Sequence, residues 1–430
     1  MGCSDPIARF ASLLLAAPVL LVAACDSPHE PPAPAVHQVT VSPDSLVTLH
    51  RTSVTVEAFA LDADGNPAEP APAFAWSSSD AGVATVEAEP GAPWRAVVST
   101  RGRGTATIRA AVGATAGEMQ LHVPGEVSPA YRVTRTGLPH ATALSDRGEV
   151  AAVTGNLSDT LRLWLWSEGG TTRRVLATGY VGGVAAAMND FGIVVFLRPC
   201  CNTGLLGFGH SWVLRNGHST GITSDYPGPS WNFVEARDVE EGGTVVGAIQ
   251  GRGPPNRAFQ WSEGQTTMLP VSDSSAWSMA TAVNAWLQVA VNEGGGVRGP
   301  DAFTGRAFLW HDGEYTAIPS PSSECLGWIG VDINADGAIL VTCGLLEQRA
   351  RSFLWDGAGF TAIPPVMIGH SLNDRGEVVG WGPEGAYHWR GGVATRLMAT
   401  QPGEGGLARI NNAGQVLLSW RGAYLLDPVD

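Results

Sequence analysis

A short pattern recurs seven times between about residue 130 and the end of this 430-residue chain. Each copy has a small apolar strand, a turn close to Asn-Asp-x-Gly, a Val-rich strand, a variable loop, a strand ending in aromatic-Leu-Trp, and a short strand ending in Leu-Pro or Ile-Pro. The turns are Leu144–Gly148, Met188–Gly192, Val239–Gly243, Val283–Leu287, Ile333–Gly337, Leu372–Gly376 and Ile410–Gly414. Four-strand units at intervals of 38 to 51 residues are typical of the blades of a β-propeller. The pattern therefore predicts an all-β chain with a seven-bladed propeller over residues 130–430.

The two ends of the repeat region predict how the ring closes. The seventh copy reaches Asp430 just after its third strand, so it lacks a fourth. Ahead of the first copy, Tyr131–Pro139 (YRVTRTGLP) resembles the fourth strands of other copies, such as Thr266–Pro270. An N-terminal strand that completes the last sheet would close the propeller and remove an exposed sheet edge. We therefore expect this segment to pair with the last sheet.

The third strand of the repeat carries a family resemblance. Arg306–Trp310 (RAFLW) and Arg257–Trp261 (RAFQW) are similar to the motif that names the bacterial extracellular HAF repeats. The resemblance covers about 300 residues and implies an extracellular propeller, without catalytic residues to carry over. The recurring Trp and Phe residues alternate along these strands as blade-to-blade packing requires, so we interpret them as core.

Residues 37–124 follow a different pattern, in which strands with period-2 alternation are separated by frequent turns. This is typical of an antiparallel β-sandwich. The stretch also resembles the group 2 bacterial Ig-like domains, which are common in surface proteins. The residues that carry the resemblance are Val39–Pro43, Ala58–Asn66, Trp76–Asp80, Val83–Val86 and Gly104–Ile108. We expect an Ig-like domain here, followed by a hinge at Pro124–Pro129.

The first residues indicate an exported, lipid-anchored protein. Arg9 precedes an apolar run, Phe10–Ala24, which is short for a membrane span and has the order of a signal peptide over residues 1–24. Two Ala residues directly before Cys25 resemble the lipobox of bacterial lipoproteins, which implies that Cys25 is lipidated and becomes the mature N-terminus. Residues 25–36 then form a Pro-rich tether. The resemblance places the chain outside the cytoplasm, anchored by lipid to the cell envelope on its periplasmic or surface side.

Charge and cysteine content restrict the partners. The formal net charge of −14 argues against nucleic acid, which requires a basic surface. Beyond Cys25, the cysteines Cys200, Cys201, Cys325 and Cys343 form an even set in an oxidising compartment. Cys325 and Cys343 flank one predicted hairpin and could staple it, and the adjacent Cys200 and Cys201 could form a bridge. Free thiols are the alternative, and the spacing is not that of a metal site.

The sequence contains no motif that predicts catalysis or a cofactor. HExxH and GxxxxGK[ST] are absent, and no GxSxG nucleophile elbow, which requires a strand-to-helix turn, is predicted. Asp332–Gly337 matches the opening of an EF-hand loop, but Cys343 stands where the twelfth-position Glu belongs. We interpret the recurring turn residues Asp146, Asp190 and Asp374 as tolerant of positive φ. His140 and His370 lie at the starts of first strands and could approach a central channel, although such residues are usually hydrogen-bonded surface histidines.

Long loops give the best indication of function. In an antiparallel blade the loops from strand two to three and from strand four to the next blade emerge on one face, and here these are the long ones. Variable loops on a rigid scaffold commonly carry binding sites, although drift in unimportant loops would look the same. The side chains suited to a sugar ring or a peptide are Tyr226, Trp231, Trp277, Arg298, Asp301 and Trp328.

Three functions are compatible with these features. The favoured one is non-enzymatic recognition of an unknown envelope protein or glycan through the long-loop face. The second is a polysaccharide-acting hydrolase or lyase at that face or at the channel mouth, which would require convergent carboxylates or a His-Arg-Tyr cluster with shifted pKa values. The third is a purely structural envelope component. No catalytic residue, metal ligand or cofactor is predicted.

Overall fold

The computed structural model describes residues 36–138, 140–154, 161–168, 170–177, 184–199, 209–223, 233–250, 255–272, 277–294, 305–344, 350–401 and 404–429. Over these residues the chain is all-β, as the sequence predicts. In this part of the chain no helix is long and apolar enough to cross a membrane. The lipidation candidate Cys25 lies outside the described residues.

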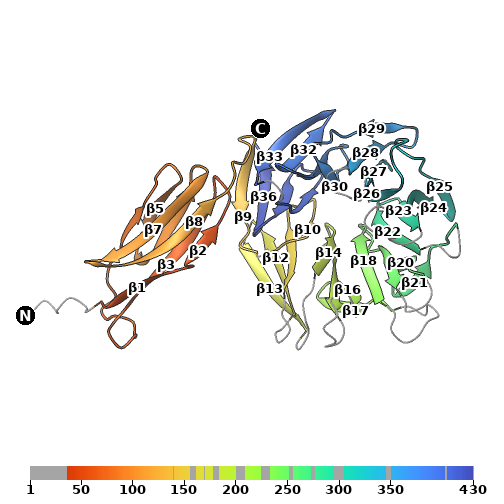
Figure 1. The fold of residues 1–430 in the computed structure, drawn as a ribbon. Helices are drawn as coiled ribbons and strands as arrows, with labels where there is room; N and C mark the ends of the chain where they lie inside the picture. The colour runs from red at the N-terminus through yellow and green to blue at the C-terminus, as the bar shows by residue number, and fades with distance from the viewer. Residues whose placement is uncertain are drawn as a thin grey trace, which may run out of the picture.

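The N-terminal strands form two four-stranded sheets around one apolar core (Figure 1). The first sheet has the order β1 (Gln38–Ser42), β3 (Ser53–Leu61), β6 (Ala92–Thr100) and β5 (Ala84–Glu89). The second has the order β2 (Ser45–Val47), β8 (Thr115–Val123), β7 (Gly104–Val112) and β4 (Ala75–Ser78). Alternate residues of each strand face the core, because side chains along a strand point to opposite sides. Val56, Val98, Ile108 and Leu121 are almost fully buried between the sheets.

The remaining sheets are arranged like the blades of a β-propeller (Figure 1). Residues of their first strands line one central cavity. The first four strands are β10 (Ala143–Leu144), β11 (Val150–Thr154), β12 (Leu161–Ser167) and β13 (Gly170–Ala177). Next come β14 (Val184–Met188), β15 (Val194–Pro199), β16 (Gly209–Arg215), β17 (His218–Gly221), β18 (Phe233–Val239), β19 (Val245–Gln250), β20 (Arg257–Ser262) and β21 (Gln265–Met268). A single parallel pair, His210–Val234, joins the group β14–β17 to the group β18–β21.

The later strands repeat the same antiparallel order. They are β22 (Trp277–Val283), β23 (Val289–Gly294), β24 (Arg306–His311) and β25 (Glu314–Ala317); β26 (Trp328–Ile333), β27 (Ile339–Cys343), β28 (Arg351–Trp355) and β29 (Phe360–Ala362); and β30 (Ile368–Leu372), β31 (Val378–Gly382), β32 (Gly385–Arg390) and β33 (Val393–Ala399). The last strands are β34 (Leu407–Ile410), β35 (Val416–Ser419) and β36 (Ala423–Pro428). Strand β9 (Tyr131–Arg135) pairs antiparallel with β36, from Tyr131 opposite Pro428 to Arg135 opposite Tyr424.

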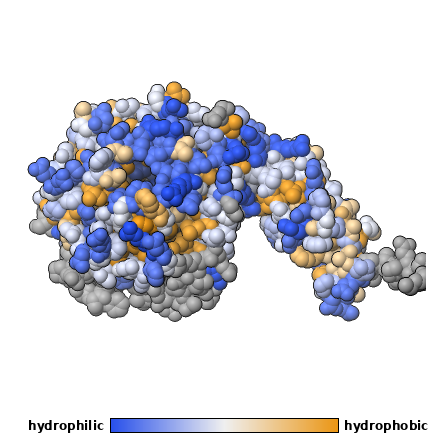
Figure 2. Space-filling model, turned by 180° about the vertical axis from the view of Figure 1, so that it is seen from behind, coloured by the Kyte–Doolittle hydropathy of each residue, from blue (hydrophilic) through white to orange (hydrophobic). Residues whose placement is uncertain are grey.

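Apolar residues fill the spaces between successive sheets. One cluster joins Ile193 and Val213 of the β14–β17 sheet to Val245 and Phe259 of the sheet that follows. The repeated third-strand aromatics occupy these spaces, and Trp261, Trp355 and Trp389 are buried. Their recurrence is therefore explained by sheet-on-sheet packing. Seen from the opposite side, the surface is largely hydrophilic and carries separate apolar patches (Figure 2).

The segment between the two regions is bonded to the propeller, which differs from the hinge expected at Pro124–Pro129. Val127 forms an antiparallel bridge with Met398 of β33, and the Ser128 N–H donates to the Leu397 carbonyl at 2.8 Å. At Gly125 an added Cβ would stand 1.7 Å from the Ala399 carbonyl oxygen. Leu49, from the sandwich, is fully buried in the cluster that also contains Val127. Proline spacing indicated a break in the fold but could not show these contacts with β33.

Candidate functional site

The innermost strands enclose a central cavity of about 630 Å³. Its wall is built from the first strand of each sheet and from the turn that follows this strand. The charged or polar groups on the wall include Thr142, Arg237, Asp238, Asp332, His370 and Arg409. Several titratable groups therefore gather around this cavity.

β-Bulges aim several of these side chains at the cavity. The register between first and second strands shifts at Ala236/Asp238, Ala280/Ala282, Gly330/Asp332 and Gly369/Ser371. A bulge places one extra residue in a strand and redirects its side chain. The extra residues are Arg237, Thr281, Val331 and His370, and all four line the cavity. Their common position, three residues before the turn Asn or Glu, is the sequence signal by which they could have been found.

Asp238 and Asp332 hold neighbouring sheets together. Oδ1 of Asp238 accepts the N–H of Val239, and Oδ1 of Asp332 accepts the N–H of Ile333, both at 2.9 Å. With Oδ2, Asp238 accepts the Val283 N–H of the next sheet at 2.9 Å, and Asp332 accepts the Leu372 N–H at 2.8 Å. Burial raises the pKa of Asp238 to about 6, and repulsion from Asp332 contributes. Burial also raises the pKa of Asp332, while the Arg409 charge opposes this shift.

Arg409 and His370 complete the charged wall. The Arg409 side chain donates to the carbonyls of Thr142 and His370 at 3.4 and 3.3 Å. His370 Nδ1 accepts the Ala408 N–H at 3.4 Å. Burial and the Arg409 charge lower the pKa of His370 to about 4, so its ring is neutral near pH 7. Of the two histidines considered from sequence, His370 reaches the cavity, whereas His140 is exposed and does not line it.

A ring of asparagine side chains connects the turns around the cavity. The Nδ2 of Asn284, Asn334, Asn373 and Asn411 donates to the backbone carbonyl of the equivalent residue in the next turn, respectively Asn334, Asn373, Asn411 and Ser145, at 2.9 to 3.3 Å. Asn189 donates to the Glu240 carbonyl in the same way at 2.9 Å. We call these five residues the asparagine ring. Ser145 and Glu240 occupy its two other positions and lack an amide donor.

Four carboxylates line the cavity at the middle position of these five-residue turns. We call Asp146, Asp190, Glu241 and Asp374 the mouth carboxylates. Asp190 accepts the Asp146 N–H at 2.6 Å, and Asp374 accepts the Ala335 N–H at 2.7 Å. Burial raises the pKa of Asp146, and repulsion from Asp190 and Asp374 adds to this.

These contacts give a different reason for the recurring Asp residues from the one expected. In the described turns it is the last residue that has positive φ, a Gly in six turns and Leu287 in the other. The Asp residues instead bond to N–H groups of neighbouring sheets. Sequence alone could not show this, because the acceptor and donor are about 40 residues apart and meet only when the sheets stand side by side.

The long-loop residues predicted to bind a ligand lie partly in the structure. Trp277 and Trp328 begin equivalent strands of two neighbouring sheets, β22 and β26. Trp328 is half-buried, packs against the apolar cluster of its sheet, and donates its indole N–H to the Ile318 carbonyl at 3.0 Å. Tyr226, Trp231, Arg298 and Asp301 lie outside the described residues, so the structure does not bring the set together.

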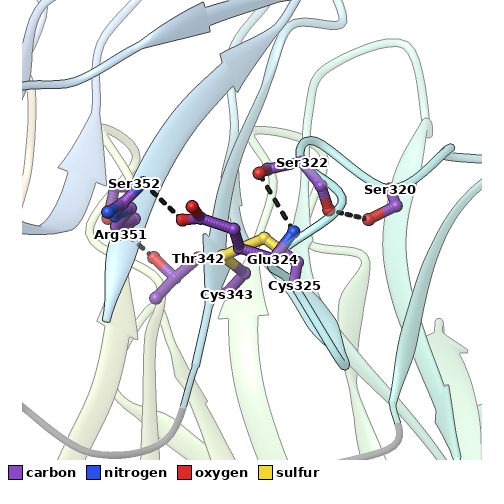
Figure 3. The surroundings of a disulfide bond; sticks show 8 residues. All are labelled: Ser320, Ser322, Glu324, Cys325, Thr342, Cys343, Arg351 and Ser352. Carbon is purple, nitrogen blue, oxygen red and sulfur yellow. Dashed lines mark hydrogen bonds and ion pairs between the residues drawn. A yellow bond between two sulfur atoms is a disulfide. The ribbon is translucent and has the colours of Figure 1, made fainter. Parts of the chain in front are cut away.

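A disulfide joins Cys325 to Cys343 at the long-loop edge (Figure 3). Their Cα atoms are 5.6 Å apart, and the bond links the loop before β26 to the end of β27. Beside it, Glu324 pairs with Arg351 at 2.9 Å, and Thr342 and Ser352 share a hydrogen bond of 2.9 Å. Cys200 and Cys201 lie outside the described residues. Within the described ranges, no three or more His, Cys, Asp or Glu side chains are arranged to hold a metal ion.

Comparison with known proteins gives likenesses of fold at low identity. Neither the known protein families nor the curated proteins contain a match to the sequence. Among solved structures, the chain is similar to YCF48 bound to D1 peptide (11% identity, 71% of this chain and 99% of that one, TM-score 0.44). It is also similar to the β-propeller domain of the Trilobed protease from Pyrococcus furiosus (15%, 69% and 95%, 0.44). A third likeness is to the fucose-specific lectin from Aleuria aurantia (11%, 78% and 98%, 0.34). At these values the fold description rests on the strand pairing itself.

Proposed function

We propose that the chain is an extracytoplasmic, lipid-anchored recognition protein whose head is a seven-bladed β-propeller. In this proposal residues 1–24 are a signal peptide, Cys25 carries the lipid, residues 25–36 are a tether and residues 37–124 are a group 2 Ig-like spacer. Residues 130–430 form the head, related to the HAF repeats. The partner is a protein or glycan of the cell envelope, and the head meets it through the long-loop face.

Two sets of contacts support seven blades in a closed ring. The asparagine ring and its two exceptions, Ser145 and Glu240, occupy seven equivalent positions in seven turns. The bond from Asn411 to the Ser145 carbonyl runs from the last of these turns back to the first. Strand β9 supplies the outer strand next to β36, in the place that β13, β25 or β33 occupies in its own sheet. Such strand exchange seals a propeller without leaving a free edge.

The hydrogen bonds made by the cavity carboxylates are the observation that supports the binding role. Asp238 and Asp332 each accept two backbone N–H groups, so their oxygens hold adjacent sheets in register. This favours a rigid scaffold over acid–base chemistry in the cavity. A rigid scaffold is what variable loops need to present a fixed binding surface. Trp277 and Trp328, at equivalent places on adjacent sheets, bring aromatic residues to that edge.

A glycan and peptide array probed with residues 26–430 tests the binding role, since this stretch contains every described residue. We expect selective binding that is lost when Trp231→Ala and Trp277→Ala are combined. Trp94→Ala is the control, because Trp94 is an exposed aromatic on the sandwich (42% exposed). Ligand binding that the double variant retains would move the site away from the long-loop face.

The anchor is tested separately in the full chain. Metabolic labelling with a radioactive fatty acid should mark the wild-type protein and leave Cys25→Ser unlabelled, and the variant should shift to the soluble fraction of the envelope. Cys3→Ser is the matched control and should label normally. Equal labelling of Cys25→Ser would overturn the lipoprotein assignment.

A further inference from the structure

The next-to-last residue of each repeat turn projects from the face opposite the long loops. These seven tip residues are Arg147, Phe191, Gly242, Trp286, Asp336, Arg375 and Ala413, and all are exposed. Phe191 and Trp286 stand out, because their side chains are 67% and 68% exposed. They belong to turns on either side of the turn that contains Glu241 and Gly242. We call Asp190, Phe191, Glu241, Gly242 and Trp286 the tip surface.

The two aromatic side chains are not required by the turns that carry them. The Phe191 N–H donates to Asn189 Oδ1 at 3.1 Å, and the Trp286 N–H donates to Asn284 Oδ1 at 3.0 Å. These bonds use only the backbone N–H of the tip residue, and the same bond forms between the Arg375 N–H and Asn373 Oδ1. Since Arg, Asp and Ala occupy this position in other turns, the turn itself does not require an aromatic side chain. Large exposed apolar side chains that the fold does not use indicate an interaction site.

Acidic groups lie between the two aromatics. Glu241 is exposed in the intervening turn, and its carboxylate accepts the Asp190 N–H. Burial raises the pKa of Glu241, and repulsion from Asp190, Asp146 and Glu240 adds to this, so several carboxylates are gathered around this turn.

The described arginines near this turn are fewer than the carboxylates gathered around it. Arg147 is the tip residue on one side, and the Arg215 guanidinium lies near Gly243. Arg375, farther round the ring, pairs with the buried Glu377 at 3.0 Å. Inside the cavity, Arg237 pairs with Glu235 at 2.6 Å.

We propose that the tip surface binds the basic side chain of an extended peptide segment in a protein partner. A guanidinium or ammonium group is attracted both to an aromatic face and to a carboxylate. Gly242 has no side chain, so the turn between Phe191 and Trp286 leaves room for a peptide to lie across it. Charge complementarity selects this occupant over a neutral glycan or an anionic membrane surface. The site is separate from the long-loop face and does not depend on it.

Fluorescence anisotropy with a labelled (Gly-Arg)₃ peptide tests the proposal on residues 26–430. We expect saturable binding, weakened about two- to fivefold by Trp286→Ala or Phe191→Ala, as loss of an exposed cation–π contact implies. Glu241→Gln should weaken binding and reduce its salt dependence. Asp336→Asn is the matched control. It also removes one carboxylate, from a tip residue outside the tip surface, and binding should be unchanged. Thermal unfolding of each variant checks that the fold is intact.

The proposal would be overturned by no binding to the wild-type chain, by equal binding of a (Gly-Gln)₃ peptide, or by equal losses in Glu241→Gln and Asp336→Asn. Stronger binding to anionic lipid vesicles than to the peptide would also overturn it in favour of a membrane surface. The Trp231→Ala, Trp277→Ala double variant should bind the peptide normally. Failure of the long-loop proposal and failure of this one therefore give different results.

Discussion

The sandwich and the propeller are both made of four-stranded, mainly antiparallel sheets, but they bury their apolar residues differently. The two N-terminal sheets share one cluster, which includes Val56, Ile108 and Leu121. In the propeller the apolar residues form separate clusters, each lying between successive sheets, and the innermost layer is polar. The sandwich thus depends on one common core, whereas the propeller depends on a succession of interfaces, each shared by two neighbours.

Polar groups fix how neighbouring sheets of the propeller are aligned. Apolar packing sets how closely two sheets approach, but it specifies their relative height only weakly. The asparagine ring and the carboxylates of Asp238 and Asp332 bond each turn or strand to a defined N–H or carbonyl of the next sheet. Because unsatisfied buried polar groups are costly, a sheet displaced along its neighbour would be penalised.

The largest effect is expected from Leu121→Ala, which removes a side chain from the common core. Leu121 is 1% exposed, and such truncations cost about 2 to 5 kcal/mol. Calorimetry should show the sandwich transition lowered and the propeller transition little changed. Leu340→Ala, in a cluster between two propeller sheets, is the reciprocal control. If Leu121→Ala lowers both transitions equally, the two regions unfold as one unit and the contrast between them fails.

Removal of the disulfide should act on the propeller alone. Cys325 and Cys343 are separated by 18 residues, and a cross-link closing a loop of that size contributes about 3 kcal/mol by restricting the unfolded chain. The double variant Cys325→Ser, Cys343→Ser should unfold at lower denaturant concentration than the wild type. Treating the wild type with a reductant should reproduce the loss, and should add nothing to the variant. A variant as stable as the wild type would show that the loop is held by its other contacts.

Asn373→Ala tests the asparagine ring directly. Its Nδ2 donates to the Asn411 carbonyl and to Glu377, and its Oδ1 accepts two turn N–H groups. Losing these bonds leaves buried partners unsatisfied, at a cost of about 1 to 3 kcal/mol. Ser145→Ala is the matched control at the equivalent position, where the side chain makes one bond within its own turn. Equal losses of unfolding free energy in the two variants would contradict a role for bonds between sheets.

The pH dependence of stability should reveal Asp238. Its folded pKa of about 6 lies above its usual 3.8, so the folded state holds this proton more tightly. Its contribution to the unfolding free energy is therefore largest below pH 3.8 and is lost as the pH rises through about 6. Asp238→Asn should flatten the stability profile between these values. Asp356→Asn should not, since backbone N–H groups lower the pKa of Asp356.

The smallest effect is expected at the one described repeat turn that ends in a residue other than Gly. Leu287 has φ of 59° where the other six turns have Gly. A left-handed conformation costs a residue with a Cβ about 1 to 2 kcal/mol, so Leu287→Gly should raise the unfolding free energy by about 1 kcal/mol. Gly359→Ala, at a site with open space and no positive φ, should change it little. A less stable Leu287→Gly would show that the exposed leucine side chain has a packing role.

The repeat made the strands predictable, but the contacts between different sheets could not be predicted from it. The turns, the buried third-strand aromatics such as Trp389, and the segment that became β9 follow from local periodicity and from what the last copy lacks. The mouth carboxylates were visible as recurring Asp residues, but their N–H partners belong to other copies. The bonded segment at Val127 and the bulge at His370 depend on which strand stands beside them, and local pattern does not encode that.

The bonds between Val127 and β33 have a mechanical consequence. Tension that reaches residue 124 from the sandwich arrives first at the Glu126–Ser128 segment, before it can reach β9. Peeling that segment from Met398 and freeing Leu49 must precede any pull on the β9–β36 pair. The contacts of the junction therefore stand between the sandwich and the β9–β36 pair when the chain is pulled from its N-terminal side.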